Sequence, residues 1–417
     1  MKKIKKCLLF VAALAICACA DDDRDPIQPG EVPNSLAFPD ASICENGFAG
    51  PYPCNGYDLM GHISLNTFGA LRGNDSWGWT DPQTNREYAL IGTDANAAFV
   101  DITDPTNPIY LGNLPTQTVS SNWRDIKVYN NHAFIVSEAP SHGMQVFDLT
   151  RLRNVPNPPE TFTPDAWYDG FGSAHNIVIN EESGFAYAVG AMTLDDTIFS
   201  FDGGPHFVNI QNPTNPVAAG GYPDDAYSHD AQVITYNGPD NEHIGKEILI
   251  GSNTNEVVIV DISDKANPIQ ISRIGYANIG YTHQGWFTED QRYFVLGDEL
   301  DELNFGYNSR SIVFDLEDLD NPALQMTYTG PTAAIDHNGY AKGDTFFLAN
   351  YTAGIRVLDI SSIGSSVIQE EGFFDTYPAN DDAIFRGAWN VYPYFESENI
   401  IISDINSGLF IIRKNNE

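Results

Sequence analysis

The chain has 417 residues and a formal net charge of −35, with 56 acidic side chains against 21 basic ones. This balance excludes nucleic acid as a default partner, because phosphate binding needs clustered Lys and Arg, and it argues against an electrostatic grip on anionic lipid. It suits a protein displayed outside the cell, and divalent cations are the sharper alternative explanation.

Residues 1–18 have the features of a lipoprotein signal peptide. Four lysines precede an apolar run, Cys7–Ile16, which is too short to stay in a membrane. The stretch Ile16-Cys17-Ala18-Cys19 resembles a bacterial lipobox, which predicts cleavage before Cys19 and lipidation of its thiol. The alternative is an ordinary signal cut nearby, with Cys19 a stray thiol.

Residues 19–40 predict an extended tether, because they are rich in Asp, Asn and Pro and poor in large apolar residues. Their acidic start resembles the export tag that carries some Gram-negative lipoproteins to the outer surface, and a solvated spacer explains it equally well. We therefore expect an exported bacterial lipoprotein of the outer membrane, on the cell surface. Its lipid would be its only contact with the membrane.

Residues 41–60 predict a short lead-in loop closed by a disulfide. Cys7 and Cys17 leave with the signal peptide and Cys19 carries lipid, so Cys44 and Cys54 remain as one pair in an oxidising compartment.

Residues 61–417 predict an all-β domain made of repeats. Apolar runs of four to seven residues alternate with turns rich in Asp, Asn, Pro and Gly, and helical periodicity is almost absent. The most regular run ends in several copies with Asp before a turn, and it occurs seven times, at residues 98–102, 144–149, 207–210, 258–262, 311–316, 355–360 and 409–412.

A second motif opens each repeat and contains His, Arg or Ser at positions 76, 124, 175, 229, 283, 337 and 386. The spacing near fifty residues predicts a seven-bladed β-propeller with four antiparallel strands per blade, and we expect a monomer. The last repeat stops after its third strand, whereas residues 61–68 form a spare strand. This N-terminal strand is predicted to complete the last blade and close the ring.

Several long motifs resemble the choice-of-anchor B family, among them Trp123-Arg124-Asp125, His283-Gln284-Gly285-Trp286 and Asp336-His337-Asn338. The resemblance extends from about residue 57 to the end of the chain. It implies a secreted or surface protein with LVIVD-type repeats, whose anchor would here be the lipid on Cys19. The family brings no established activity.

The opening motifs and the hairpins between second and third strands should meet at one mouth of the propeller channel. Four imidazoles there are candidate ligands for a divalent metal ion: His175, His229, His283 and His337. Other candidate ligand residues at this mouth are Arg124, Asp125, Glu138, Asp230, Asp298, Glu299, Asp336, Arg386 and Asp404.

Three explanations of this ring stay open. Repeated His and Asp side chains can tie blades together, they can hold an ion, or they can bind a metal-free ligand. The leading functional hypothesis is a lipid-anchored binding module for an extracellular protein, peptide or glycan. The alternative is a metal-dependent hydrolase or oxidase that uses the His-lined mouth.

Two further features are predicted to be less informative. The acidic stretch 298–302 lacks the glycine and the spacing of an EF-hand loop, which favours a solvated hairpin. Most tryptophans are predicted to fill the core between blades, with Trp167 the best candidate for a ligand contact.

Overall fold

The computed structural model describes residues 41–223 and 227–415. The predicted signal peptide, the tether and Cys19 lie outside the described residues. Within the described part of the chain, no helix has the length and apolar composition that crossing a membrane requires.

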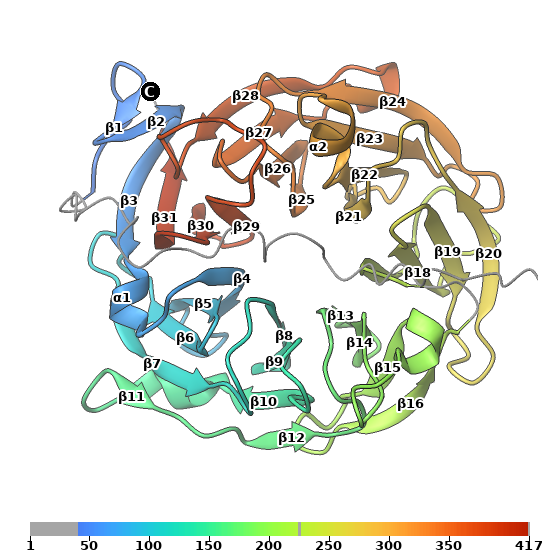
Figure 1. Ribbon diagram of the computed structural model, residues 1–417, viewed down its shortest axis with the longest axis horizontal. Coiled ribbons are helices and arrows are strands. Elements are labelled where there is room, and N and C mark those ends of the chain that lie inside the picture. Colours follow the sequence, from blue (N-terminus) through green and yellow to red (C-terminus); the bar gives the residue numbers. More distant parts are fainter. Residues whose placement is uncertain (1–40, 224–226, 416–417) are drawn as a thin grey trace, which may run out of the picture. The chain divides into compact units, whose positions relative to one another are not determined.

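The described chain forms the predicted seven-bladed β-propeller (Figure 1). Each blade is a four-stranded antiparallel sheet, and the first strand of each blade contacts the first strand of the next around a closed ring. From the channel outward, the first blade consists of β4 (Gly73–Thr80), β5 (Glu87–Thr93), β6 (Asn96–Asp101) and β7 (Ile109–Pro115), and the second consists of β8 (Arg124–Tyr129), β9 (His132–Ser137), β10 (Met144–Asp148) and β12 (Ala166–Tyr168). The third consists of β13 (Asn176–Asn180), β14 (Phe185–Val189), β15 (His206–Asn209) and β16 (Val217–Gly221). The fourth consists of β17 (Asp230–Thr235), β18 (Glu247–Ser252), β19 (Val257–Asp261) and β20 (Ile269–Ile274).

The last three blades follow the same order. They are β21 (Thr282–Phe287), β22 (Tyr293–Asp298), β23 (Arg310–Asp315), β24 (Ala323–Thr329); β25 (Gly339–Lys342), β26 (Thr345–Ala349), β27 (Ile355–Asp359), β28 (Gln369–Phe374); and β29 (Ala388–Tyr392), β30 (Asn399–Asp404), β31 (Gly408–Lys414), β3 (Tyr57–Ile63). The remaining elements are short: β1 (Phe48–Ala49), β2 (Tyr52–Asn55), β11 (Glu160–Thr161), α1 (Leu65–Phe68), α2 (Asp301–Phe305), η2 (Leu149–Asn154), η3 (Ser200–Gly203) and η4 (Ile363–Ser365).

The ring closes as predicted, because the N-terminal strand β3 pairs with the last strand β31. The strand occupies Tyr57–Ile63, however, and not residues 61–68, so the expected boundary at residue 61 falls inside it. Its side chains alternate between buried and half-buried, which fixes the register from Tyr57↔Lys414 to Ile63↔Leu409. Residues 65–68 form α1 instead, which ends at Gly69 in the left-handed conformation.

The lead-in residues 41–60 are more ordered than a loop. Cys44 and Cys54 form a disulfide, and Cys54 of β2 pairs with Phe374 of β28. This pairing extends the sixth blade at its outer edge by β2 and β1, which covers the edge of β28.

The core lies between neighbouring blades and not within each sheet. For example, Phe134 of β9 and Val146 of β10 pack with Ile177 of the next blade. Five of the seven third strands end in an Asp whose carboxylate caps the following turn, as Asp261 does by accepting a hydrogen bond from the Ser263 amide at 3.0 Å. The repeated apolar and Asp positions therefore serve folding, which leaves the channel-facing residues for function.

Candidate functional site

Four histidines line one mouth of the channel in a continuous row. They lie at or just before the starts of four successive inner strands, β13, β17, β21 and β25. The ring centroids of His175 and His229 are 4.4 Å apart, those of His229 and His283 are 4.3 Å apart, and those of His283 and His337 are 4.4 Å apart. All four side chains are buried, so the structure brings the four predicted imidazoles into one cluster.

Hydrogen bonds at Nδ1 fix the orientation of three of these rings. Nδ1 of His229 lies 3.0 Å from the backbone oxygen of His283, and Nδ1 of His337 lies 2.6 Å from that of Trp389. Nδ1 of His175 lies 2.6 Å from the carboxylate of Glu138. Because carbonyl and carboxylate oxygens only accept hydrogen bonds, each Nδ1 carries the proton and each Nε2 carries the lone pair.

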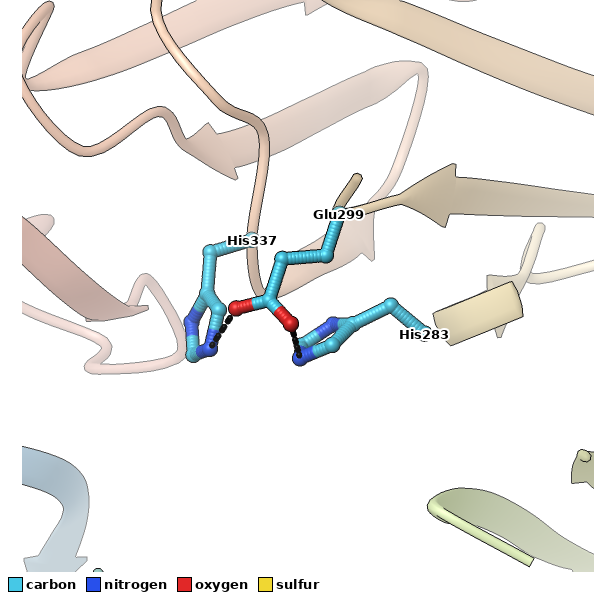
Figure 2. Close-up of side chains that lie close together, drawn as sticks. All are labelled: His283, Glu299 and His337. Atoms are coloured by element: carbon cyan, nitrogen blue, oxygen red, sulfur yellow. Dashed lines mark ion pairs between the residues drawn. The ribbon is translucent and has the colours of Figure 1, made fainter. Parts of the chain in front are cut away.

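Glu299 joins two of the histidines (Figure 2). One carboxylate oxygen lies 3.6 Å from Nε2 of His283, and the other lies 3.6 Å from Nε2 of His337. The hydroxyl of Tyr351 donates a hydrogen bond to Glu299 Oε1 at 2.9 Å. Both histidine distances exceed a hydrogen bond, so the carboxylate faces the two imidazoles without being hydrogen-bonded to either.

Burial keeps three of the four histidines neutral. Loss of hydration lowers the pKa of His283 and His229 well below the usual range, and the neighbouring imidazoles lower it further. Burial likewise lowers the pKa of His337 to about 3. Neutral imidazoles are the form in which histidine binds metal ions, because the Nε2 lone pair is then available.

The first and last repeats are shifted relative to the sequence prediction. His337 donates to the backbone of Trp389 as His229 donates to that of His283, so Trp389 and not Arg386 occupies the histidine position of the seventh blade. Arg386 lies half-buried before β29. Both inner strands are irregular here, with a β-bulge between Ala388 and Asn390 in β29 and one between Gly73 and Ser76 in β4.

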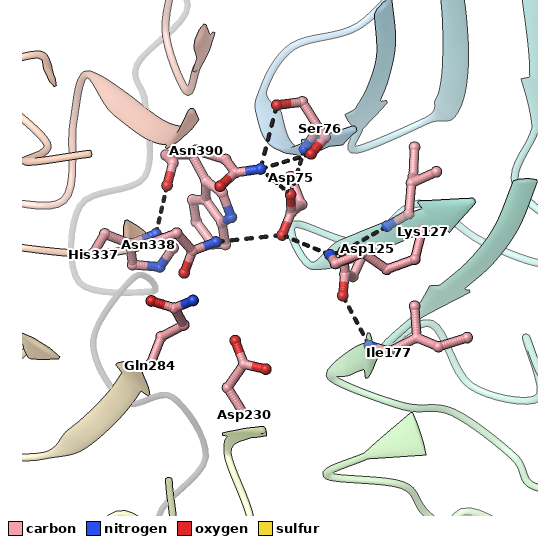
Figure 3. Close-up of polar contacts among 12 residues, drawn as sticks. Asp75, Ser76, Asp125, Lys127, Ile177, Asp230, Gln284, His337, Asn338 and Asn390 are labelled. Atoms are coloured by element: carbon pink, nitrogen blue, oxygen red, sulfur yellow. Dashed lines mark hydrogen bonds and ion pairs between the residues drawn. The ribbon is translucent and has the colours of Figure 1, made fainter. Parts of the chain in front are cut away.

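A layer of acidic and amide side chains lies next to the histidines in sequence and in the middle of the channel (Figure 3). Its members are Asp75, Asp125, Asp230, Gln284, Asn338 and Asn390. Asp125 accepts a hydrogen bond from the Ile177 amide at 2.8 Å, and Gln284 accepts one from the Gly339 amide at 2.9 Å. Lys127 contacts Asp125 at 2.5 Å. These contacts tie neighbouring blades together, so Asp125 belongs to a structural layer and not to the histidine mouth.

The same layer contains two carboxyl groups that burial makes weak acids. Burial raises the pKa of Asp230 to about 7, with a further contribution from the nearby charge of Asp125. Burial also raises the pKa of Asp75 well above its usual range, and Lys127, 3.9 Å away, opposes this shift. Lys127 is therefore a cation that several carboxyl groups of this layer share.

Other predicted ligand residues have structural partners. Asp298 accepts hydrogen bonds from the amides of Gly280 and Tyr281 at 2.8 and 2.6 Å. Asp404 accepts them from the amides of Asn406 and Ser407 at 2.8 and 2.7 Å. These two carboxylates hold turns in place and do not face the histidines.

Arg124 and Asp336 are also buried, but in other clusters. Arg124 lies 3.0 Å from Nε2 of His142 and donates to the Thr93 carbonyl at 3.0 Å. Asp336 lies in a buried acidic cluster with Asp301 and Glu302.

The prediction of a solvated hairpin at 298–302 is therefore wrong. Asp301 and Glu302 are 0% and 4% exposed, and Asp301 forms an ion pair with Arg310 at 2.5 Å. Burial raises the pKa of Asp336 well above its usual range, and Asp301 adds to the shift. The same hairpin carries Glu299 to the histidines, because α2 packs its acidic first turn inward.

Two residues of the mouth were missed at the sequence level. Tyr351 positions Glu299, and the Trp389 ring lies 4.7 Å from that of His337. The spacing of 52 residues between His337 and Trp389 matches the other repeats and could have identified the tryptophan. No local pattern marks the Tyr351 hydroxyl.

Comparison with known proteins supports the architecture. The LVIVD repeat model matches residues 248–274, which include β19, β20 and most of β18. The chain is thus a propeller protein with an LVIVD repeat. A search of curated proteins found no match.

Solved structures share the fold at low identity. A proposed 6-phosphogluconolactonase from Bacteroides uniformis is 14% identical with a TM-score of 0.53, and the match covers 76% of this chain and 88% of that one. Hydrazine synthase from Kuenenia stuttgartiensis is 14% identical with a TM-score of 0.50, covering 79% and 93% of the two chains. At this identity the likeness shows the fold alone, because propellers carry many unrelated functions.

Proposed function

We propose that this protein is a binding propeller whose functional site is the histidine-lined channel mouth, and that this site binds one transition metal ion. One observation carries the proposal. Nε2 of His283 and Nε2 of His337 each face a carboxylate oxygen of Glu299 at 3.6 Å. Two ligand atoms that are each ~2.1 Å from a tetrahedral ion lie about 3.4 Å apart, close to this separation.

The surroundings of the histidines support the same conclusion. Metal-binding histidines commonly donate the other ring N–H to a carbonyl or carboxylate, which fixes the tautomer and raises ligand basicity. His337 donates to the Trp389 carbonyl, and His175 donates to Glu138 in the same manner. A purely structural row of histidines would need only one hydrogen bond each and would not need Glu299 between two of them.

The donor set restricts the kind of ion. Imidazole nitrogens with one carboxylate suit zinc, copper, iron or nickel, whereas calcium and magnesium prefer oxygen ligands throughout. His283, His337 and Glu299 would hold the ion, and His229 is the next imidazole in the row. The bound ion would present open positions to a ligand from outside.

The N-terminal sequence supports a proposal for the site of action. The proposal includes export as a lipoprotein, anchoring through Cys19 on the outer surface, and membership of the choice-of-anchor B family. An extracellular protein, peptide or glycan would then be the partner of a monomeric propeller. Cys19→Ser is expected to release the protein from the membrane fraction, and unchanged lipid attachment in this variant would contradict the anchor.

Metal titration tests the site. The full chain is purified in detergent without a polyhistidine tag, stripped with a chelator, and titrated calorimetrically with Zn²⁺ and Cu²⁺. We expect one ion per chain, with binding lost in the His283→Ala/His337→Ala double variant. His132→Ala is the matched control, because His132 is the first residue of β9 and its Nδ1 donates to the nearby Asn130 carbonyl at 2.8 Å.

Two results would overturn the metal site. One is the absence of saturable binding by folded protein, and the other is equal affinity in the wild type and the double variant. Circular dichroism and a denaturation curve establish folding in each case.

Catalysis is a second candidate function, and one observation favours it. Two histidines with one carboxylate are the donor set of catalytic zinc and non-haem iron sites, because this set leaves coordination positions open. Hydrolysis of p-nitrophenyl acetate and oxidation of a phenolic dye are the first assays. Turnover that appears on metal loading and disappears in Glu299→Gln supports an enzyme, and unchanged turnover in that variant excludes this site.

A further inference from the structure

The opposite mouth of the channel contains a second hollow. The histidines lie at the starts of the inner strands, whereas the hollow is lined by residues from their ends and from the turns that follow. Two adjoining parts of about 280 and 400 Å³ share Trp77, Gln232 and Trp286 in their walls. This volume is in the range of small-ligand sites. The acidic and amide layer separates it from the histidines.

Two tryptophans form the apolar wall of this hollow. Trp77 and Trp286 are both half-buried, and both pack edge-on against Tyr340, with centroid distances of 5.8 and 4.9 Å. The hydroxyl of Tyr394 donates to the Ala341 carbonyl at 3.0 Å, which fixes a third ring at the rim. The rings are held by the blade core, so binding would cost little side-chain entropy.

Polar groups stand beside these rings. Gln232 accepts a hydrogen bond from the Phe287 amide at 2.8 Å, which orients its side chain, and Glu289 accepts one from the Gly343 amide at 2.7 Å. Glu181 lines both parts of the hollow from the turn after β13. The wall therefore combines fixed aromatic faces with amide and carboxylate groups, which can bind hydroxyls.

The charges of the hollow restrict its ligand. Glu181 and Glu289 disfavour an anion. Lys127 already lies over the Trp77 ring, 4.7 Å from its centroid, which disfavours a second cation at that ring. A neutral ligand with both an apolar face and many hydroxyls meets these conditions.

We propose that this second mouth binds a neutral sugar, as one or two hexose units of a glycan. The C–H face of a pyranose ring would stack on Trp286 or Trp77, and its hydroxyls would bond Gln232, Glu181 and Glu289. The site does not depend on the metal mouth, because the two openings share none of the lining residues named here.

Calorimetry with four neutral tetrasaccharides tests the inference: maltotetraose, cellotetraose, mannotetraose and chitotetraose. We expect the full chain to bind at least one of them with a millimolar or tighter dissociation constant. Trp286→Ala should weaken binding about tenfold or more, equivalent to about 1.4 kcal/mol. Glu181→Ala should also weaken it, and because Glu181 is exposed this variant keeps the inference testable if the Trp286 variant misfolds.

Two controls define the outcome. Trp167→Ala removes an exposed tryptophan of the outer strand β12 and should leave sugar binding unchanged. His283→Ala should leave it unchanged as well, so failure here is distinct from failure of the metal site. No binding of any of the four sugars by folded protein overturns the inference, as does equal binding by wild type and both pocket variants.

Discussion

The histidine row and the acidic and amide layer are built from neighbouring residues of the same inner strands, but their polar atoms have different partners. In the layer, Asp125 and Gln284 each accept a backbone amide of the next blade. In the row, Nδ1 of His229 and of His337 bonds a backbone oxygen of the next blade, whereas Nε2 of His283 and of His337 faces Glu299 at 3.6 Å. One repeated motif therefore supplies both the contacts that join the blades and two imidazole nitrogens that face one carboxylate.

Removing a carboxylate from the layer should have the largest effect. Asp125→Ala takes away the nearest carboxylate of Lys127 and the acceptor of the buried Ile177 amide. We expect a loss of about 3–5 kcal/mol in the free energy of unfolding, as for other broken buried ion pairs. Chemical denaturation measures it. Asp125→Asn keeps an acceptor for the amide and should lose less. A loss below about 1 kcal/mol in the alanine variant would contradict the structural role of the layer.

Acid should destabilise the fold through histidines outside both regions. His206 is buried, its Nε2 lies 2.9 Å from the Tyr168 hydroxyl, and burial lowers its pKa to about 4. The unfolded chain therefore binds more protons below pH 6.5, so stability is complete above that pH and falls as pH decreases toward 4. This group accounts for up to about 3 kcal/mol.

Denaturation curves recorded at several pH values between 7.5 and 4 give the free energy of unfolding, which is then plotted against pH. His206→Gln should flatten the slope, whereas the half-exposed His132→Gln should leave it unchanged. An unaltered slope in the His206 variant would show that this residue does not couple folding to pH.

The outer partner of the row should affect metal affinity and not stability. Glu138→Gln weakens the acceptor of His175 Nδ1–H, which lies 2.6 Å away. We expect a decrease of about tenfold in Zn²⁺ affinity if His175 contributes to the site, in the range seen for other outer-shell partners. Affinity unchanged within error would show that His175 contributes nothing beside His283, His337 and Glu299.

The smallest effect is expected at Tyr351. Tyr351→Phe removes the hydroxyl that donates to Glu299 at 2.9 Å and keeps the ring. Zn²⁺ affinity should fall severalfold, corresponding to about 1 kcal/mol or less. If the free energy of unfolding falls by about the same amount and the Zn²⁺ affinity does not change, the contact between Tyr351 and Glu299 is purely structural.

Most of the fold could be predicted because each repeat is marked by sequence patterns that extend over only a few residues. The apolar runs, the Asp-capped turns and the spare N-terminal strand each act over a few residues, and the structure confirms seven blades closed by β3 and β31. The convergence of His283 and His337 follows from the same repeat. The offsets in the first and last blades did not follow, because the repeat spacing does not show where a strand is bulged, as β4 and β29 are near Ser76 and Ala388.

The bridging role of Glu299 required long-range information. Its stretch looked like a solvated hairpin because it is acidic, but packing of α2 buries Asp301 and Glu302 and places Glu299 between two blades. The aromatic hollow is similar. Trp77 and Trp286 were expected as core fillers, and they are half-buried at a mouth because the turns between the first and second strands of the blades leave space around them.

Anomalous diffraction from crystals grown with Zn²⁺ tests the metal proposal most directly. The account predicts one strong peak at the histidine mouth, about 2.1 Å from Nε2 of His283 and of His337 and within bonding distance of a Glu299 oxygen. A crystal grown with Zn²⁺ that shows no anomalous peak between these three side chains, or that shows zinc only on exposed carboxylates, would contradict the metal proposal.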